Sequence, residues 1–459
     1  MTDDVYAGTW QSHPDAEQYL HELYRAFGER MPLVTELEER ALEAASCRLV
    51  DLIDAVVLSQ SEDVVTRLER LGYREQARRC EPGRTCWGHP GAILPDLLLQ
   101  EDAGGETRIP LAVRLRVASI AKLQMTLGCS AVIDGAPLAP YRRAQMAELG
   151  GLSLEAVERR YTRDHLVSET AAVSAEAYLT AFDAWACRPR HGHDLDAALS
   201  ATQELAEDLV SQVGPDAAAW IAFAAERVYW QQRNLTGRIQ RRRQDALGLG
   251  WANHDHHTFR SSRRAFARLI RLLETFGFEC REQFYAGAEA GWGAQVLEHP
   301  TCGIVIFADV DLAPGEVSGD FAHRELEPKN ELGTVGLWCA LHGESLLDAG
   351  LHHLAARFDF DRFREDITRE GRGMLAPFSD RPILRQAFSQ GERWPLPEDR
   401  LQRLANDGIV SAQQVERFRT AGAMGSHIEN IQRGEGFKGF SQSSVSDIIR
   451  RTDPRGENA

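Results

Sequence analysis

The sequence has no apolar run of about 20 residues, the length that a membrane-spanning helix needs. Its first residues, MTDDVYAGTWQSHPD, lack the basic and apolar regions of a secretory signal peptide. None of its 8 cysteines forms a C-x-x-C pair, and the spacing of the nearest two, Cys80 and Cys86, fits no common zinc site. We therefore expect no membrane partner, a cytoplasmic location and free structural thiols.

Basic charge is also scarce, because 52 Lys and Arg stand against 68 Asp and Glu, for a formal net charge of -16. This balance argues against a nucleic-acid partner, which needs a basic surface. The one basic run, Arg238 to Asp245, ends a predicted helix, where positive charge suits the helix dipole. P-loop, dinucleotide-binding and G-x-S-x-G motifs are missing, which disfavours the enzymes that use them. We expect a small-molecule partner, and a homo-oligomer stays open.

The 459 residues exceed the roughly 250 to 300 that one core usually reaches, so we expect two or three domains. Up to Gly248, apolar spacing of three and four predicts mainly helices, with strand-like stretches at RLVDLIDAVVLS and AILPDLLLQ. Beyond it, NHDHHTFR, FECREQFYAG, WGAQVLEH and GIVIFADVDL predict four strands, with a helix from Ser262 to Phe276 after the first. The prediction is an α+β chain, with a mainly helical domain over residues 1–248 and a βαβββ-based domain over residues 249–455.

The start of this βαβββ unit recurs later in the chain. The same spacing of histidine, arginine and phenylalanine is found in two sets, His256, Arg260, Phe266 and His353, Arg357, Phe363. Each histidine lies on a strand-like stretch that leads into an amphipathic helix. The repeat predicts paired βαβββ modules whose two imidazoles point into one cavity and enclose a metal site.

A fainter echo of the first module lies near residues 50–100, in DAVVLSQSEDVVTRLERLGYREQARRCEPGRTCWG. Ala55 and Val56 occupy the histidine positions there. The echo is either a degenerate module that cannot bind metal or a chance similarity.

Two imidazoles and one carboxylate, with other positions open, form the facial triad of non-haem Fe(II) oxygenases, although Zn, Mn or Ni can use similar ligands. Glu429, in the strand-like stretch MGSHIENIQRGEGFKGF, is the favoured carboxylate. Its rivals are the acidic residues at the end of the first module and in the following loop, namely Asp309, Asp311, Glu325, Glu327 and Glu331.

Side chains alternate along a strand, so His254 and His256 should share one face while His257 takes the other. The repeat selects His256 as the ligand. We expect His254 to support the site, and His257 and His352 to pack behind it or meet solvent.

Arg260 and Arg357 follow the paired histidines at a spacing that predicts the same face. A guanidinium beside a metal can clamp a substrate carboxylate through two hydrogen bonds, although a surface ion pair is the alternative. In GFKGFSQSS, Lys438, Ser441 and Gln442 could also reach a substrate near the metal, or simply form the strand and turn that close the module.

HGHDLD, from His191 to Asp196, has metal-like spacing. Asp194 precedes a long amphipathic pattern, however, and Asp is a favoured helix N-cap. The prediction here is a capped helix start.

Together the motifs resemble those of the 2-oxoadipate dioxygenase/decarboxylase family, or hydroxyglutarate synthases, of the vicinal-oxygen-chelate superfamily. The resemblance covers about residues 250 to 450 and depends on His256 to Arg260, His353-Leu354-Ala355-Ala356-Arg357, and Ile428-Glu429 with Arg433-Gly434. It implies that His256, His353 and Glu429 hold Fe(II), that Arg260 binds a substrate carboxylate, and that O2 is the co-substrate. The chain departs from the family at Ala355-Ala356, where Thr-Pro is usual, and at His352, where Asn is usual, which leaves the particular 2-oxo acid open.

The leading hypothesis is therefore an Fe(II)-dependent, O2-consuming oxygenase of the dioxygenase/decarboxylase type that acts on a 2-oxo acid or an amino acid-like carboxylate. The same site could serve a non-oxidative isomerase, lyase or hydrolase with Zn, Ni or Mn. A non-catalytic small-molecule-binding protein is the third alternative. Turnover without oxygen would favour the second class, and ligand binding without metal or turnover would favour the third.

Overall fold

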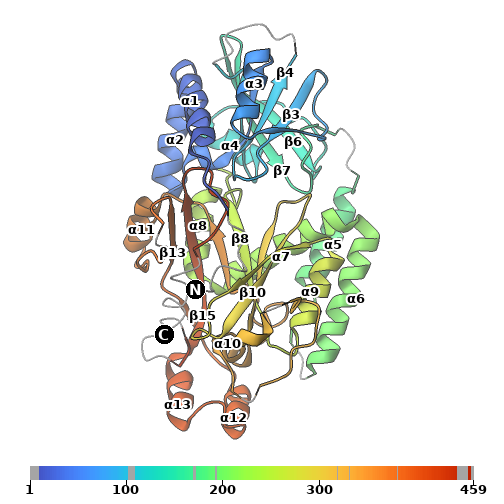
Figure 1. Cartoon of the computed structure of the whole chain (residues 1–459), viewed down its shortest axis with the longest axis vertical. Coiled ribbons are helices and arrows are strands. Elements are labelled where there is room, and N and C mark those ends of the chain that lie inside the picture. The colour runs from blue at the N-terminus through green and yellow to red at the C-terminus, as the bar shows by residue number, and fades with distance from the viewer. Residues whose placement is uncertain are drawn as a thin grey trace.

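The computed structural model describes residues 10–101, 109–168, 172–191, 194–317, 319–329, 331–379, 381–441 and 453–455. Two mixed β-sheets lie one above the other along the long axis of the molecule, with the N-terminal sheet at the top of Figure 1. Their strand orders are β2-β3-β4-β1-β5-β7-β6 and β13-β15-β12-β8-β11-β10-β9, with β14 paired to β15.

The N-terminal sheet is built from two modules. The first contains β1 (Ile53–Ser59), α3 (Glu62–Arg70), β2 (Arg74–Gln76), β3 (Arg84–Gly88) and β4 (Asp96–Gln100). The second contains β5 (Ala112–Arg116), α4 (Ile120–Leu127), β6 (Tyr141–Leu149) and β7 (Leu152–Arg159). They join through the antiparallel pair β1–β5. Two helices precede them, α1 (Pro14–Arg30) and α2 (Pro32–Ala45), followed by the 3-10 turn η1 (Leu49–Leu52).

Four helices then lead to the second sheet, α5 (Ala175–Ala186), α6 (Leu195–Val213), α7 (Pro215–Arg233) and α8 (Leu235–Asp245). The side chain of Asp194 accepts hydrogen bonds from the backbone N–H groups of Asp196 and Ala197, at 3.0 and 3.2 Å. This N-cap satisfies donors that the first helical turn leaves free, so the predicted capped start of α6 is confirmed.

The C-terminal sheet also contains two modules, joined by the antiparallel pair β8–β12. The first contains β8 (His254–Arg260), α9 (Phe266–Thr275), β9 (Glu279–Tyr285), β10 (Trp292–Glu298) and β11 (Val305–Asp311). The turn η2 (Pro314–Glu316) and α10 (Thr334–His342) lead to the second, which contains β12 (His353–Ala356), α11 (Phe360–Arg369), β13 (Leu384–Phe388), β14 (Glu392–Trp394), α12 (Glu398–Asn406), α13 (Ala412–Ala421) and β15 (Ala423–Arg433).

The predicted α+β fold with paired βαβββ modules is confirmed. The N-terminal half, however, contains five more strands than the two segments that looked strand-like, namely β2, β3, β5, β6 and β7. Charged residues interrupt several of them, as in AVRLR and YRRAQMAEL, so their apolar alternation is weak. A division into domains at residue 248 stays a prediction.

Helices cover the outer face of the C-terminal sheet. Phe223 of α7 lies with its ring 5.3, 5.7 and 5.1 Å from the rings of His257, Phe259 and Phe278. The apolar residues of α9, including Phe266 and Ile270, join the same core. Burial of this face leaves the opposite face of β8, β12 and β15 to carry polar chemistry.

The two sheets share one register around their central strands. β1 pairs with β5 so that Ala55 faces Arg114, and β8 pairs with β12 so that His256 faces Ala355. Both pairs have a register shift one residue earlier on β1 and β8, around Asp54 and Asp255 respectively. β5 pairs in parallel with β7, and β12 with β15, so Glu155 is equivalent to Glu429. The whole chain thus contains two copies of one arrangement.

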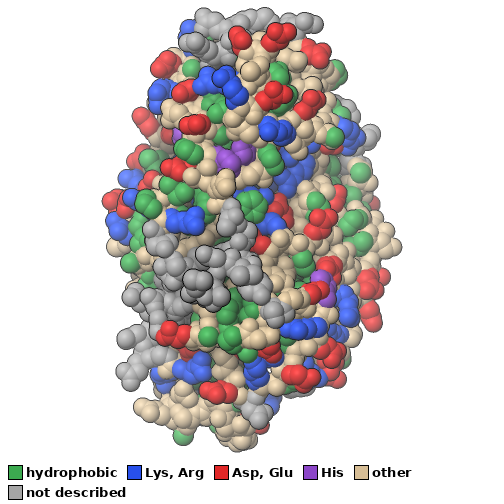
Figure 2. All heavy atoms as spheres, viewed as in Figure 1, with side chains coloured by type: hydrophobic (Ala, Val, Ile, Leu, Met, Phe, Trp, Pro, Cys, Tyr) green, Lys and Arg blue, Asp and Glu red, His purple; other side chains and the backbone are tan. Residues whose placement is uncertain are grey.

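Acidic and basic side chains are interspersed over the face seen in Figure 2, and no continuous basic stripe crosses it. All 8 cysteines are free thiols. In the described part of the chain, no helix combines the length and apolar character that crossing a bilayer requires.

Candidate metal centre

His256, His353 and Glu429 meet on the inner face of the C-terminal sheet, on the neighbouring strands β8, β12 and β15. Oε2 of Glu429 lies 3.2 Å from Nε2 of His256 and 2.9 Å from Nε2 of His353. All three side chains are buried. Three ligands about 2.1 Å from an ion and at right angles to one another lie about 3 Å apart, so this donor set fits a facial metal site.

The first imidazole is held from behind. Nδ1 of His256 lies 3.0 Å from Oδ1 of Asp255, whose carboxylate also pairs with the guanidinium of Arg433. Carboxylate–histidine pairs of this kind fix the orientation and tautomer of a metal-binding ring. Burial disfavours a charged imidazole, but Glu429 and Asp255 together raise the pKa of His256 to about 9.

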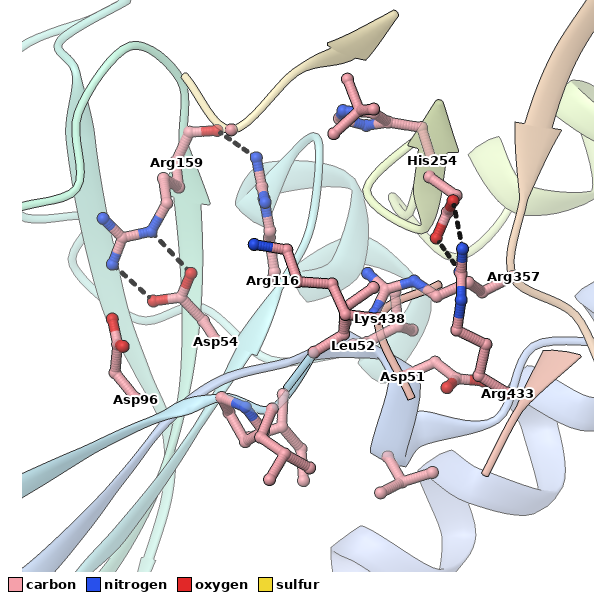
Figure 3. A pocket seen from close by; sticks show the side chains of 18 of the residues that line it. Asp51, Leu52, Asp54, Asp96, Arg116, Arg159, His254, Arg357, Arg433 and Lys438 are labelled. Atoms are coloured by element: carbon pink, nitrogen blue, oxygen red, sulfur yellow. Dashed lines mark hydrogen bonds and ion pairs between the residues drawn. The ribbon is translucent and has the colours of Figure 1, made fainter. Parts of the chain in front are cut away.

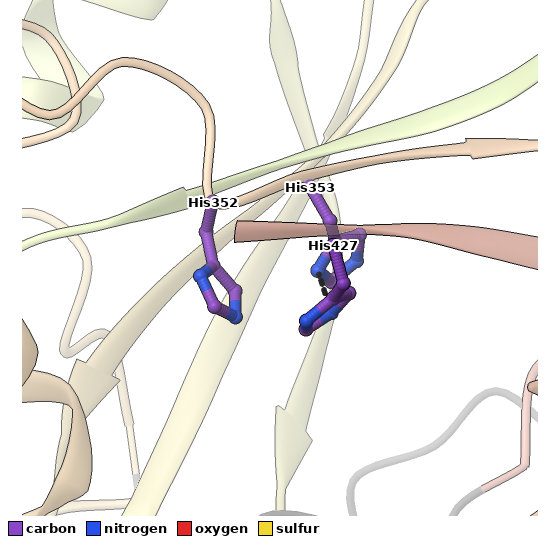
Figure 4. Close-up of side chains that lie close together, drawn as sticks. All are labelled: His352, His353 and His427. Carbon is purple, nitrogen blue, oxygen red and sulfur yellow. Dashed lines mark hydrogen bonds between the residues drawn. The ribbon is translucent and has the colours of Figure 1, made fainter. Parts of the chain in front are cut away.

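The second imidazole is held by another histidine. Nδ1 of His353 lies 3.2 Å from Nε2 of His427, and the two rings stack with their centroids 4.9 Å apart (Figure 4). His352 packs beside them and its Nδ1 lies 3.2 Å from the carbonyl oxygen of Gly425. Burial holds the pKa of His352 and of His427 well below the usual range, so both are neutral. Nε2 of His353 is thereby left to face Glu429.

The carboxylate is also fixed on its far side. Nε2 of Gln386, on β13, donates to Oε1 of Glu429 at 2.7 Å. The backbone N–H of Ser441 donates to Oε1 of the same glutamine at 3.1 Å. Despite burial, the two imidazoles hold the pKa of the Glu429 carboxyl well below its usual range. Each of the three ligands therefore presents one atom to a shared point and uses its other atom to hold position.

Thr258 adds a hydroxyl to this point. Its Oγ1 lies 2.8 Å from Nε2 of His353, and it stands between His256 and Arg260 on β8. The side chain is buried. No sequence signal marks Thr258 as part of a site, because threonine is common in strands.

A guanidinium lies on the same face. Arg260 is buried, its Nε makes no hydrogen bond among the described residues, and it lies 3.9 Å from Oδ2 of Asp309. The ring of Trp338 is 5.6 Å from the centre of the guanidinium. Burial raises the pKa of Asp309 to about 7, although Arg260 opposes the shift. The neighbouring carboxylate of Asp309 therefore balances the positive charge of Arg260 only in part.

The rival carboxylates have other positions. Asp311 accepts hydrogen bonds from the backbone N–H groups of Val335 and Gly336, at 3.0 and 2.9 Å, and so caps α10. Asp309 is buried beside Arg260, and the three loop residues Glu325, Glu327 and Glu331 are exposed. None of these five carboxylates lies close to both His256 and His353, as the carboxylate of Glu429 does.

Aromatic rings surround the cluster. The ring of His256 lies 4.8 Å from that of Phe307 and 5.2 Å from that of Phe440, and the ring of His353 lies 5.4 Å from that of Phe388. Further aromatic residues continue this apolar lining, namely Phe284, Trp292, Trp338, Phe378 and Trp394. Such surroundings limit the access of water to whatever the polar groups bind.

The predicted position of His254 was wrong. The register shift at Asp255 turns His254 to the other face of β8, where its ring lies 5.5 Å from that of His257. Its Nδ1 lies 2.8 Å from the carbonyl oxygen of Trp251. His257 is on that outer face as predicted, and its Nε2 lies 3.1 Å from a nitrogen of Arg227. A β-bulge breaks the simple alternation from which the His254 prediction was made.

Arg357 and Lys438 are not brought to the cluster. Both line a separate pocket between the two sheets, which His256, His353 and Glu429 do not line. Ser441 lies close, because it contacts Gln386, and its Oγ is buried without a hydrogen-bond partner among the described residues. Gln442 lies outside the described residues.

The equivalent place in the N-terminal sheet holds no histidine. Ala55 and Ala112 stand at the two histidine positions, as the matching registers show. Glu155 keeps the carboxylate, and the guanidinium of Arg114 pairs with it at 2.8 Å and with Glu81 at 2.5 Å. Arg114 is fully buried. A fixed cation of the protein thus neutralises the carboxylate that in the other sheet faces two imidazoles.

Three other described groups combine possible metal ligands. The buried group His352, His353 and His427 shares His353 with the cluster and has no carboxylate. The remaining two groups are Cys86, Asp96, His165 and Glu274, Cys280, His323. In the first, the guanidinium of Arg78 already pairs with Asp96. The second is exposed. Neither has the buried, oriented ligands of the C-terminal cluster.

No family model matches the chain, and neither does any curated protein. Among solved structures, a mutant of 4-hydroxymandelate synthase from Streptomyces coelicolor matches at 12% identity over 87% of this chain and 98% of that chain, with a TM-score of 0.29. The Mn(II)-bound glyoxalase from Novosphingobium aromaticivorans matches at 10% identity over 89% and 91%, with a TM-score of 0.19. A fusion protein of a xylose isomerase-like TIM barrel and 4-hydroxyphenylpyruvate dioxygenase matches at 12% identity over 94% and 57%, with a TM-score of 0.24. Similarities this low assign no reaction.

Proposed function

We propose that the protein is an Fe(II)-dependent oxygenase that consumes O2 and acts on a 2-oxo acid or an amino acid-like carboxylate. In this proposal His256, His353 and Glu429 hold the iron, and Arg260 binds a substrate carboxylate. The main support is that two imidazole Nε2 atoms and one carboxylate oxygen converge on a buried point. Each of the three side chains also contacts a neighbouring side chain that fixes its orientation.

Fe(II) bound there would supply the redox chemistry that couples oxidation and decarboxylation of a 2-oxo acid to the reduction of O2. The protein's own residues have the remaining tasks. Arg260 offers a planar set of donors to a carboxylate, and burial strengthens that contact by excluding water. The hydroxyls of Thr258 and Ser441 provide further polar contacts near the iron ligands. The aromatic lining keeps solvent from the bound substrate.

Oxygen uptake and CO2 release test the proposal directly. We would load the purified protein anaerobically with Fe(II), add O2, and screen a panel of 2-oxo acids and amino acids, with His353→Ala as the inactive comparison. Uptake that needs a panel compound and disappears in the variant is the expected result. Full turnover in the absence of O2 would contradict the oxygenase assignment and favour an isomerase, lyase or hydrolase with another metal.

Replacing Arg260 by glutamine should weaken substrate binding about 10- to 100-fold, because a charge-assisted contact contributes roughly 1.5 to 3 kcal/mol. Arg260 is not one of the three proposed ligands, so iron content should be unchanged. KM from oxygen-uptake kinetics and iron by elemental analysis would check this. An unchanged KM would exclude Arg260 from substrate binding.

Replacing Asp255 by asparagine should lower iron affinity about 10- to 100-fold, the usual effect of losing a carboxylate behind a histidine ligand. Asp54→Asn is the matched control. Asp54 occupies the equivalent bulge in the N-terminal sheet and pairs with Arg159, but it touches no candidate ligand. Iron titration under anaerobic conditions measures both variants. An equal loss of iron affinity in the two variants would mean that Asp255 affects the metal site only by stabilising the fold.

A further inference from the structure

A second pocket lies between the two sheets. Its volume is about 340 Å³, and its walls come from both halves of the chain (Figure 3). The residues Asp255 and Phe440 line it and also contact His256, so they form a wall between this pocket and the metal centre. No candidate iron ligand lines it.

The pocket repeats the internal duplication of the chain. On one side Asp54 forms a bidentate pair with Arg159, with distances of 2.7 and 2.8 Å. On the other side Asp255 pairs in the same manner with Arg433. The registers make Asp54 equivalent to Asp255, and Arg159 equivalent to Arg433. Figure 3 shows Asp54 and Arg159 on one side of the pocket and Arg433 on the other.

Another equivalent pair, Arg116 and Arg357, lies between these ion pairs (Figure 3). Neither guanidinium has a carboxylate partner within 4.0 Å in the described part of the chain. Arg116 donates to the carbonyl oxygen of Arg159 at 3.5 Å, and the Nε of Arg357 is buried without a hydrogen bond. Burial lowers the pKa of Arg116 to about 10, and Arg159 and Arg357 add to the shift while Asp54 opposes it. The centre of the pocket is therefore strongly positive.

The ammonium group of Lys438 adds a third positive charge to the lining of the pocket. It lies 3.8 Å from Glu298, a carboxylate that Arg281 and Arg163 already contact at 3.0 and 3.2 Å. The lining contains more basic than acidic side chains, although the whole chain has a net charge of -16. Two uncompensated guanidinium groups at this position cost stability unless an anion joins them.

We propose that this pocket binds a phosphate dianion, either free or as the phosphate group of a small organic molecule, with Arg116 and Arg357 as its two clamps. Guanidinium groups bind phosphate oxygens through paired hydrogen bonds, and two of them neutralise a dianion. The volume exceeds that of inorganic phosphate, so the same site accommodates the phosphate group of a small organic phosphate. Because the ligand touches both sheets, its binding joins the two halves of the molecule.

Calorimetry on the metal-free protein, in chloride buffer of constant ionic strength, tests the site without any need for turnover. The probes are inorganic phosphate, glycerol phosphate and succinate. We expect saturable binding of at least one phosphate probe, weakened tenfold or more in Arg116→Gln and in Arg357→Gln. Arg403→Gln, which removes an exposed arginine paired with Asp399, should bind as the wild type does. A preference for glycerol phosphate over inorganic phosphate would identify an organic ligand.

Binding that is equally strong in the two pocket variants, or absent for both phosphate probes, would overturn the proposal. Succinate binding alone would also overturn its phosphate chemistry. If either variant fails to fold, thermal unfolding of the wild type decides the matter. Phosphate should then raise Tm above that in chloride at equal ionic strength, and no difference would contradict an anion site.

Discussion

Replacing Glu429 by glutamine should reduce bound iron from one equivalent to about a tenth or less, and turnover by more than about 100-fold. The amide keeps the size of the side chain but removes the charge that balances a divalent ion. Its carbonyl oxygen also binds Fe(II) more weakly than a carboxylate does. We expect similar losses for His256→Ala and His353→Ala, because three ligands leave no redundancy.

Glu155→Gln provides the matched control for this experiment. Glu155 occupies the same register position in the N-terminal sheet, and it contacts Arg114 instead of two imidazoles. Iron content should therefore remain at one equivalent in Glu155→Gln. Elemental analysis after anaerobic loading and desalting would measure both variants. Retention of iron by Glu429→Gln would exclude Glu429 as a ligand and make Asp309 the next candidate for the carboxylate ligand.

Replacing Arg114 by methionine should lower the free energy of unfolding by about 3 to 5 kcal/mol, the usual cost of removing one partner from a buried ion pair. The substitution removes the fully buried guanidinium that joins the buried carboxylate of Glu155 to the partly buried carboxylate of Glu81. Arg143 contacts Glu155 at 3.5 Å and Glu81 at 2.5 Å as well, but its side chain is more exposed than that of Arg114, so water weakens its ion pairs.

A second substitution separates lost charge balance from lost packing. In Arg114→Met, the further change Glu155→Met should restore part of the stability, because it removes a carboxylate that no longer has its partner. Urea unfolding followed by tryptophan fluorescence would compare the variants. Arg403→Met, at an exposed ion pair, should leave the unfolding midpoint unchanged. Equal stability of wild type and Arg114→Met would contradict a central role for the buried arginine.

The C-terminal half was largely predictable from sequence. The strands of its first module alternate apolar residues between turn signals, so β8, β9, β10 and β11 were expected close to their observed bounds. The repeated spacing around His256 and His353 indicated which of several histidines belong together. Glu429 followed from its position on a late strand and from a family resemblance.

Other features depend on tertiary geometry that local patterns do not encode. A one-residue bulge turns the side chain of His254 to the opposite face of β8, and no feature of the composition marks such a bulge. Arg357 has the spacing of Arg260 but faces the pocket between the sheets. His427 could have been found, because it lies two residues before Glu429 on the same strand and so shares its face. The contact between Gln386 and Glu429 joins residues on different strands, which periodicity cannot pair.

The position of β15 also determines when the metal centre can assemble. This strand is the last in the described part of the chain, yet it inserts between β12 and β13 and brings Glu429. A nascent chain that has emerged only as far as α13 therefore has both histidines but an incomplete ligand set, and β12 exposes an unpaired edge. Unpaired edges promote association between chains. Synthesis of β15 is thus the stage at which aggregation competes with assembly of the candidate metal centre. Truncation before Ala423 would expose the edge of β12 and remove the third proposed ligand.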